Sequence, residues 1–182
     1  MRFLDAGAVD AALSYPALVD VLQEAFAKGA VAPPRHHHSV ALENAPEATP
    51  LLMPAWEASQ PGAVTAGRYM GVKVVTVFPG NVPKGDPAVY GTYVLLSAGS
   101  GAPLAIIDAT RLTAWRTGAA SALASRILSR LDARVLTMVG AGALAPMLVR
   151  AHASVRPIRE VVLWNRSPGR LQGLADALHA DG

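Results

Sequence analysis

The chain has 182 residues, of which 52% are hydrophobic and 16% are charged, and its formal net charge at pH 7 is +3. This apolar content excludes intrinsic disorder, and the length is enough for one or two domains with a substantial core. The basic residues are scattered and aromatic residues are few, which argues against nucleic-acid binding. The absence of cysteine excludes disulfides, a thiol nucleophile and cysteine metal ligands.

The sequence also indicates where the protein is found. No long apolar segment precedes Asp5, and no stretch of about 18 uncharged apolar residues follows, so neither a signal peptide nor a membrane-spanning helix is expected. We therefore expect a cytoplasmic protein that has no membrane partner.

The first part of the chain is predicted to combine a helix with a sheet. The helix is expected between Ser14, which suits an N-cap, and Gly29, which suits a helix end. A proline- and histidine-rich passage, 33–38, then leads into a strand. Further strands are predicted at 49–56, 69–78, 90–97 and 104–108.

Apolar periodicity predicts a long second helix at 110–131. One face of each helix is expected to be buried. These faces carry Leu18, Leu22, Ala25 and Phe26 on the first helix, and Leu112, Trp115, Ala119, Ala122 or Leu123, and Ile127 on the second.

A strand, a glycine turn, a helix and another strand follow one another after residue 133. The strand 134–139 leads into Gly140-Ala141-Gly142-Ala143-Leu144-Ala145, a helix is predicted at 147–153, and the next strand at 160–164. Glycines let the backbone turn tightly and approach a pyrophosphate, which binds the free N–H groups at a helix N-terminus. In this βαβ context the pattern predicts a dinucleotide site that includes Gly140, Ala141, Gly142 and Ala143.

Asn165-Arg166-Ser167 follow the second strand, where such domains meet the adenosine ribose. NAD sites usually carry an acidic residue there, whereas a guanidinium and a hydroxyl suit a 2′-phosphate. These three residues therefore favour NADP(H) over NAD(H) as the cofactor. The alternative is a solvated turn, because Asn-Arg-Ser-Pro-Gly is also good turn chemistry.

A last helix is predicted at 169–180, and the sequence ends at Gly182. Only two of the roughly six strands of a full dinucleotide domain are then present. We expect an incomplete nucleotide domain, and a 182-residue form that is poorly stable and essentially inactive.

Three basic residues are candidates for chemistry. Lys73 lies in an apolar strand, where a lysine costs free energy unless its amine reaches a cleft or a partner. It suits proton transfer, or it is an edge-strand lysine that limits aggregation. Arg116, on a helix rich in small residues, could bind a carboxylate or form a structural ion pair. Arg35 is either a loop anchor or a carboxylate ligand.

Two further groups of polar residues are given structural interpretations. His36 and His38 would share one face of a strand, but no third ligand is recognisable, so we expect no metal. Ser121 and Ser125 have no base nearby in the sequence and are interpreted as helix filling.

Six segments of the sequence carry a family resemblance. They are Pro34-Arg35, 52–56, 71–81, 101–105, 112–117, and Gly140-Ala141-Gly142 with Trp164-Asn165-Arg166. In these segments the chain resembles the ornithine cyclodeaminase/mu-crystallin family, and most of all its bacterial Δ1-pyrroline-2-carboxylate reductases. The resemblance extends from Pro33 to the end.

The resemblance implies an α/β fold in two parts. A mixed α/β substrate-binding and dimerisation domain would occupy 1–132, and the first half of a doubly wound Rossmann domain would occupy 133–182. It also implies a homodimer when the protein is full length.

Residue roles follow from the matching motifs. Arg35 and Arg116 would hold the substrate carboxylate, Lys73 would face the reacting carbon–nitrogen centre, and Thr117 would touch the cofactor. Family members usually carry glutamine where Leu144 stands, and their catalytic aspartate would lie beyond Gly182.

The prediction is an NADP(H)-dependent oxidoreductase that reduces a cyclic imino acid of the Δ1-pyrroline-2-carboxylate type to the amino acid. An ornithine cyclodeaminase, which would retain NAD, is the alternative enzyme, and the lack of an acid at Asn165 counts against it. The alternative from another class is a mu-crystallin-like protein that binds NADPH and a small molecule without turnover.

Overall fold

The computed structural model describes residues 1–62 and 66–180. Its contacts divide the chain into two compact units. The first unit comprises Met1–Ala12 and Glu24–Thr113, and the second unit comprises Leu13–Gln23 and Ala114–Gly182.

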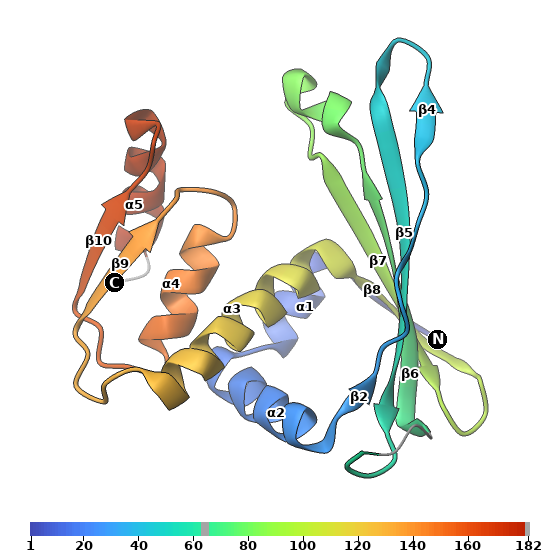
Figure 1. The fold of residues 1–182 in the computed structure, drawn as a ribbon. Coiled ribbons are helices and arrows are strands. Elements are labelled where there is room, and N and C mark those ends of the chain that lie inside the picture. Colours follow the sequence, from blue (N-terminus) through green and yellow to red (C-terminus); the bar gives the residue numbers. More distant parts are fainter. Residues whose placement is uncertain (63–65, 181–182) are drawn as a thin grey trace. The chain divides into compact units, whose positions relative to one another are not determined.

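The first unit is built on an eight-stranded sheet (Figure 1). The pairs along its main path are antiparallel, except that β1 and β8 are parallel. In spatial order the path runs β1 (Arg2–Leu4), β8 (Pro103–Asp108), β7 (Val89–Ser97), β6 (Ala66–Val77), β5 (Ala45–Ala58) and β2 (Ala30–Val31), while β3 (His36–His37) and β4 (Val40–Leu42) also pair with β5.

Strand β5 contains two prolines that a fully paired central strand would rarely accept, Pro50 and Pro54. One side of β5 pairs with β6 along most of its length, but the other side meets only the short strands β2, β3 and β4. Because this second edge is only partly covered, missing backbone N–H groups are tolerated there.

The four strands predicted between residues 49 and 108 are all present, and the first two are longer than predicted. The sequence did not predict β1, β2 or the short helix α1 (Ala6–Ala12). These pieces are brief, and they depend on tertiary pairing rather than on periodicity. The strand expected from residues 33–38 onward is present as two short pieces, β3 within that passage and β4 just after it.

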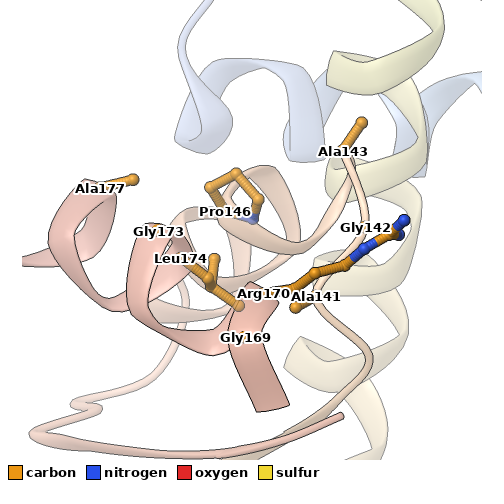
Figure 2. A pocket seen from close by; sticks show the side chains of 9 residues that line it. All are labelled: Ala141, Gly142, Ala143, Pro146, Gly169, Arg170, Gly173, Leu174 and Ala177. Atoms are coloured by element: carbon orange, nitrogen blue, oxygen red, sulfur yellow. The ribbon is translucent and has the colours of Figure 1, made fainter. Parts of the chain in front are cut away.

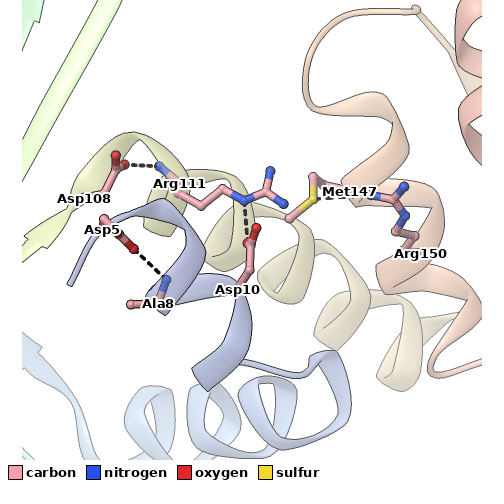
Figure 3. A network of polar contacts seen from close by, with 7 residues as sticks. All are labelled: Asp5, Ala8, Asp10, Asp108, Arg111, Met147 and Arg150. Atoms are coloured by element: carbon pink, nitrogen blue, oxygen red, sulfur yellow. Dashed lines mark hydrogen bonds and ion pairs between the residues drawn. The ribbon is translucent and has the colours of Figure 1, made fainter.

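Acidic side chains set two helix starts in the first unit (Figure 3). The Asp5 carboxylate accepts a hydrogen bond from the backbone N–H of Ala8 (2.8 Å) at the start of α1. At the start of α3 (Ala109–Leu128), the Asp108 carboxylate accepts one from the N–H of Arg111 (2.7 Å). The Arg111 side chain pairs in turn with Asp10 of α1. The two carboxylates satisfy backbone donors that a helix start leaves open, and the ion pair of Arg111 with Asp10 joins α3 to α1.

In the second unit, helices pack around one apolar cluster. The helices are α2 (Tyr15–Lys28), α3 and α4 (Ala145–Ala153). A Cβ on Gly118 of α3 would lie 3.1 Å from the Met147 carbonyl and 3.1 Å from the Tyr15 ring, so small residues permit this close approach. The buried cluster consists of Tyr15, Val19, Ala119, Ala122, Leu123, Met147 and Ala151.

The nucleotide-type part of the second unit matches the prediction. Strands β9 (Val135–Val139) and β10 (Glu160–Trp164) are parallel neighbours, with α4 between them in sequence. The 3-10 turn η2 (Pro168–Arg170) and α5 (Leu171–His179) follow. This is the first βαβα half of a Rossmann fold, as predicted.

Three residues predicted on buried helix faces are exposed: Ala25, Phe26 (69%) and Ile127 (65%). All three lie in the last turn or two of their helices, beyond the apolar cluster. The second helix also ends at Leu128 rather than 131.

Arg156 closes the end of α3. It is only 7% exposed, and its guanidinium donates hydrogen bonds of 2.6–3.1 Å to backbone carbonyls. Those acceptors belong to Ser125, Arg126, Ser129, Arg130 and Val155. Carbonyls at a helix C-terminus lack partners within the helix and carry partial negative charge, so a buried guanidinium stabilises this end.

The two units do not follow the predicted division at residue 132. Residues of α3 from Ala114 onward belong to the second unit because they form the apolar cluster with α2 and α4. The functional division into 1–132 and 133–182 therefore stays a prediction. Within the part of the chain that the structure describes, no helix is long and apolar enough to cross a membrane.

Candidate functional site

The glycine loop connects β9 to α4. Gly140 has a φ of +109°, which favours glycine, and its N–H donates to the Trp164 carbonyl at the end of β10 (2.7 Å). Further along the loop, the Ala145 N–H donates to the Gly142 carbonyl (2.9 Å) as α4 begins. These contacts hold the loop against the carboxyl ends of both parallel strands, where ligands bind in such sheets.

Backbone donors are open at this loop. The N–H groups of Gly142, Ala143 and Leu144 donate to no described residue, and a Cβ on Gly142 would meet no atom within 4 Å. Successive free N–H groups at a helix N-terminus bind phosphate oxygens, and the helix dipole favours the negative charge. The loop therefore fits the pyrophosphate of a dinucleotide.

Asn165 connects the glycine loop to the turn after β10. Its side-chain oxygen accepts from the Ala141 N–H (3.2 Å), and its amide nitrogen donates to the Ser167 carbonyl (2.8 Å). The sequence analysis assigned Asn165 to direct cofactor contact. In the structure both ends of its amide have an internal partner, so the side chain holds the loop and the turn together, and direct cofactor contact stays a prediction.

The arginines of this turn are exposed and unpaired. Neither Arg166 nor Arg170 has a side-chain partner among the described residues, and Ser167 is also exposed. Arg170 lines a cavity of about 340 Å³ between the glycine loop and α5 (Figure 2). The wall includes Ala141, Gly142, Ala143, Gly169, Gly173 and Leu174, and no carboxylate. The sequence analysis missed Arg170; the signal was a second arginine four residues after Arg166.

A second group of candidate residues lies on the sheet of the first unit. In the strand register Met53 of β5 is opposite Lys73 of β6, which is opposite Tyr93 of β7. His36 pairs with Leu52, so continuing that register by one residue places Arg35 opposite Met53. Directly opposed residues share a face. Arg35, Lys73 and Tyr93 therefore belong to one row across the same face of the sheet.

Lys73 cannot be an edge-strand lysine, because β6 has β5 on one side and β7 on the other. Its side chain is partly buried at the middle of the sheet. This position rules out the protective interpretation and leaves a polar group presented from a central, rigid strand.

Tyr93 reaches diagonally across to Gly71. A Cβ on Gly71 would lie 2.4 Å from the Tyr93 hydroxyl oxygen, so only glycine leaves room for this ring. Burial raises the pKa of Tyr93 above its ordinary value of 10.0, so the hydroxyl stays protonated at neutral pH. Tyr93 was not identified from the sequence, because its contact with Gly71 depends on the pairing of β6 with β7.

The two predicted carboxylate-binding arginines are exposed. Neither Arg35 nor Arg116 forms an ion pair or hydrogen bond with another described side chain, so the structural ion pair considered for Arg116 is not present there. Thr117, the next residue on α3, is partly buried. Arg35 and Lys73 belong to the first unit, whereas Arg116, Thr117 and the glycine loop belong to the second.

The histidines at 36–38 and Ser121 were both given structural interpretations from the sequence. His36, His37 and His38 are exposed, and the described residues hold no group of three or more potential metal ligands. Ser121 does have a base nearby in space: its hydroxyl is 3.0 Å from Nε2 of His152 on α4. Burial lowers the pKa of His152 below 6.5. Sequence separation concealed this contact between α3 and α4.

The fold and the glycine loop define a protein of the NAD(P)-binding Rossmann class. The sequence model of the ornithine cyclodeaminase/mu-crystallin family matches residues 3–181. The chain therefore belongs to this family, as the resemblance predicted.

Known proteins agree with this assignment. The chain is 47% identical to the SAR DEFICIENT 4 protein of Arabidopsis thaliana over 132 residues, which is 72% of this chain and 39% of that protein. It is 35% identical over 176 residues to the Δ1-pyrroline-2-carboxylate reductase of Colwellia psychrerythraea, covering 96% of this chain and 53% of the relative.

A solved structure extends the comparison to the fold. The Δ1-pyrroline-2-carboxylate reductase of Thermococcus litoralis, in complex with NADH and L-proline, superposes with a TM-score of 0.84 at 29% identity. The match covers 100% of this chain and 54% of that one. The chain thus spans about half the length of these relatives or less.

Proposed function

We propose that the protein containing this chain reduces a cyclic imino acid to the corresponding amino acid with NADP(H), as an NADP(H)-dependent imine reductase. The observation that carries the proposal is Lys73, presented from a central strand in one row with Arg35. Relatives named Δ1-pyrroline-2-carboxylate reductase support the substrate class.

Each residue has a defined part in this proposal. Guanidinium groups bind carboxylates with two charge-assisted hydrogen bonds, so Arg35, in the row with Lys73, would hold the substrate carboxylate, and the family resemblance assigns the same part to Arg116. The Lys73 ammonium donates to the imine nitrogen and supplies the proton that this nitrogen takes up on reduction. Tyr93, protonated beside Lys73, is a further donor on the same face.

The second unit would hold the cofactor. The open N–H groups of Gly142, Ala143 and Leu144 would bind the pyrophosphate, with Gly140 and Ala141 shaping the loop and Thr117 as a further contact. A bound nicotinamide dinucleotide supplies the hydride that reduces the carbon of the C=N bond.

The preference for NADP(H) rests on the turn after β10. Asn165 leaves that turn without a carboxylate, and Arg166, Ser167 and Arg170 are exposed beside it. The Thermococcus relative was crystallised with NADH. The proposal that this chain differs depends on these unpaired guanidinium groups, which suit a 2′-phosphate.

We also propose that the protein is a homodimer. The sheet face opposite Lys73 carries large apolar side chains that are 37–73% exposed: Phe3, Leu52, Tyr90 and Leu104. Several large exposed apolar side chains on one sheet face are typical of an interface. Leu52→Glu should convert a dimer into monomers, which sedimentation velocity would detect.

The activity is tested by following NADPH oxidation with Δ1-pyrroline-2-carboxylate. Lys73→Ala should lower turnover about 10²–10⁴-fold, the usual value of a proton-transfer group, and leave NADPH affinity nearly unchanged. Lys84→Ala, at the exposed 3-10 turn η1 (Pro79–Lys84), is the matched control. Retention of more than about a tenth of the wild-type turnover would exclude this role for Lys73.

Two other results of the same assay would favour the alternatives. Ammonia release from ornithine would indicate a cyclodeaminase. Tight NADPH binding without turnover on any cyclic imine would indicate a small-molecule binding protein.

A further inference from the structure

The cavity between the glycine loop and α5 has one charged side chain in its wall, Arg170. We propose that Arg170 is a second phosphate-binding residue that contacts the 2′-phosphate of the cofactor and contributes to the choice of NADP(H). This inference rests on the proposed function and assigns a specificity-determining role to a residue outside the family motifs quoted above.

The position of Arg170 carries the argument. Arg170 is the last residue of η2 and directly precedes α5. Its side chain extends toward the glycine loop, with the guanidinium at Gly142 in the view of Figure 2. The adenosine ribose of a bound dinucleotide lies at the end of the second strand, here Trp164, and the pyrophosphate lies at the loop. Arg170 therefore borders the space between the two anchoring points of the adenosine half.

The cavity has room for an anion because its other walls are small. Ala141, Gly142, Gly169 and Gly173 bring almost no side chain into it. The carboxylate nearest to Arg170 on α5, Asp176, accepts a hydrogen bond from Gln172 (2.8 Å), so it is already engaged. A phosphate entering this space would meet a guanidinium, and no acid of the wall would repel it.

The two arginines of the turn are not equivalent. Arg166 lies two residues after the end of β10 and does not line the cavity, whereas Arg170 does. The internal hydrogen bond from Asn165 to the Ser167 carbonyl fixes the backbone between them. The adenosine ribose lies between the pyrophosphate at the glycine loop and the end of β10, so Arg170 can reach its 2′-phosphate from the loop side and Arg166 from the strand side.

The experiment measures dissociation constants of NADPH and NADH by fluorescence or calorimetry, on the natural protein that contains this chain. Arg170→Ala should weaken NADPH about tenfold or more and change NADH less than about twofold, because only NADPH carries the extra charged group. Arg170→Lys should retain part of the NADPH affinity. Arg159→Ala, an exposed arginine just before β10 at the opposite end of that strand, is the control and should change neither.

Three outcomes would separate the possibilities. Equal weakening of NADPH and NADH by Arg170→Ala would overturn the assignment, since it would indicate contact with the shared pyrophosphate, stacking on adenine or a disturbed loop. An unchanged ratio in Arg170→Ala, with a collapsed ratio in Arg166→Ala, would also overturn it while leaving the proposed NADP(H) preference intact. A wild-type protein that binds NADH as tightly as NADPH would refute the proposed preference itself, and the inference with it.

Discussion

At the C-terminal end of α3, Arg156 is 7% exposed and its guanidinium donates to five backbone carbonyls, whereas in the turn after β10 Arg166 and Arg170 are exposed and have no described side-chain partner. Both regions belong to the second unit. The difference shows how one residue type serves two purposes. A buried guanidinium with its donors engaged is part of the fold, while guanidinium groups kept open beside a glycine loop are available to an anion.

The first unit shows the same contrast in one row of the sheet. Tyr93 packs its ring over Gly71 and is fixed by the backbone around it. Arg35, near the other end of the row, is exposed and has no described side-chain partner. A polar side chain fixed by its packing and one without a described side-chain partner therefore lie in the same row, and substitutions should separate them by which property changes.

Arg156→Ala should have the largest effect on stability, lowering the free energy of unfolding by about 3–5 kcal/mol, because the carbonyls at the end of α3 would stay buried without donors. Urea denaturation followed by circular dichroism measures this loss. Arg159→Ala, which is exposed, should stay within about 0.5 kcal/mol of wild type. A loss below about 1 kcal/mol in Arg156→Ala would mean that water can replace the guanidinium there.

Gly71→Ala should destabilise the protein by about 1–3 kcal/mol through overpacking. The added Cβ would lie 2.4 Å from the Tyr93 hydroxyl and 2.7 Å from the Val94 carbonyl, and the second contact is with backbone of the neighbouring strand. The matched control is Gly99→Ala, whose Cβ would meet only the Ser97 hydroxyl at 3.9 Å. Equal unfolding midpoints for the two variants would show that the sheet relaxes freely at Gly71.

The main elements of this fold follow from local pattern. Runs rich in β-branched and aromatic residues predicted β6 and β7, and the strand–glycine–helix order predicted β9, α4 and β10 correctly. The short elements β1 and α1 were not predicted, because they depend on contacts with residues distant in the sequence. Strand β1, for example, pairs with β8. Phe26 and Ile127 were assigned to buried faces because periodicity does not tell where a packing partner ends.

Only those residues of the candidate site that lie in recognisable sequence motifs could be predicted. The glycine loop and Lys73 stand out in the sequence, and the structure adds the central position of Lys73. Tyr93, Arg170 and the contact of Ser121 with His152 depend on register and helix packing, which no local window contains. Asn165 was identified, but its internal hydrogen bonds to Ala141 and Ser167 were not.

Asn165→Asp tests whether the Asn165 amide stabilises the turn or only leaves the turn without a negative charge. The carboxylate can still accept from the Ala141 N–H, but it cannot donate to the Ser167 carbonyl, so stability should fall by about 1 kcal/mol. NADPH should also bind more weakly than to wild type, because the new charge repels a 2′-phosphate. Urea midpoints and dissociation constants measure the two effects. Ser167→Ala, which leaves that carbonyl in place, should keep wild-type stability.

His152→Gln should show the smallest effect, and only in acid. Burial lowers the pKa of His152 below its ordinary 6.5, so between the folded and unfolded pKa values the unfolded chain binds a proton that the folded chain does not. The wild-type protein therefore loses stability as the pH falls below about 6.5, while above this pH the residue contributes no pH dependence. The variant should lose less stability than wild type between pH 7.5 and 5.5, as measured by urea midpoints. His179→Gln, at the exposed end of α5, should follow wild type at both pH values. If the His152 variant also follows wild type, burial does not hold the His152 imidazole neutral in the folded protein.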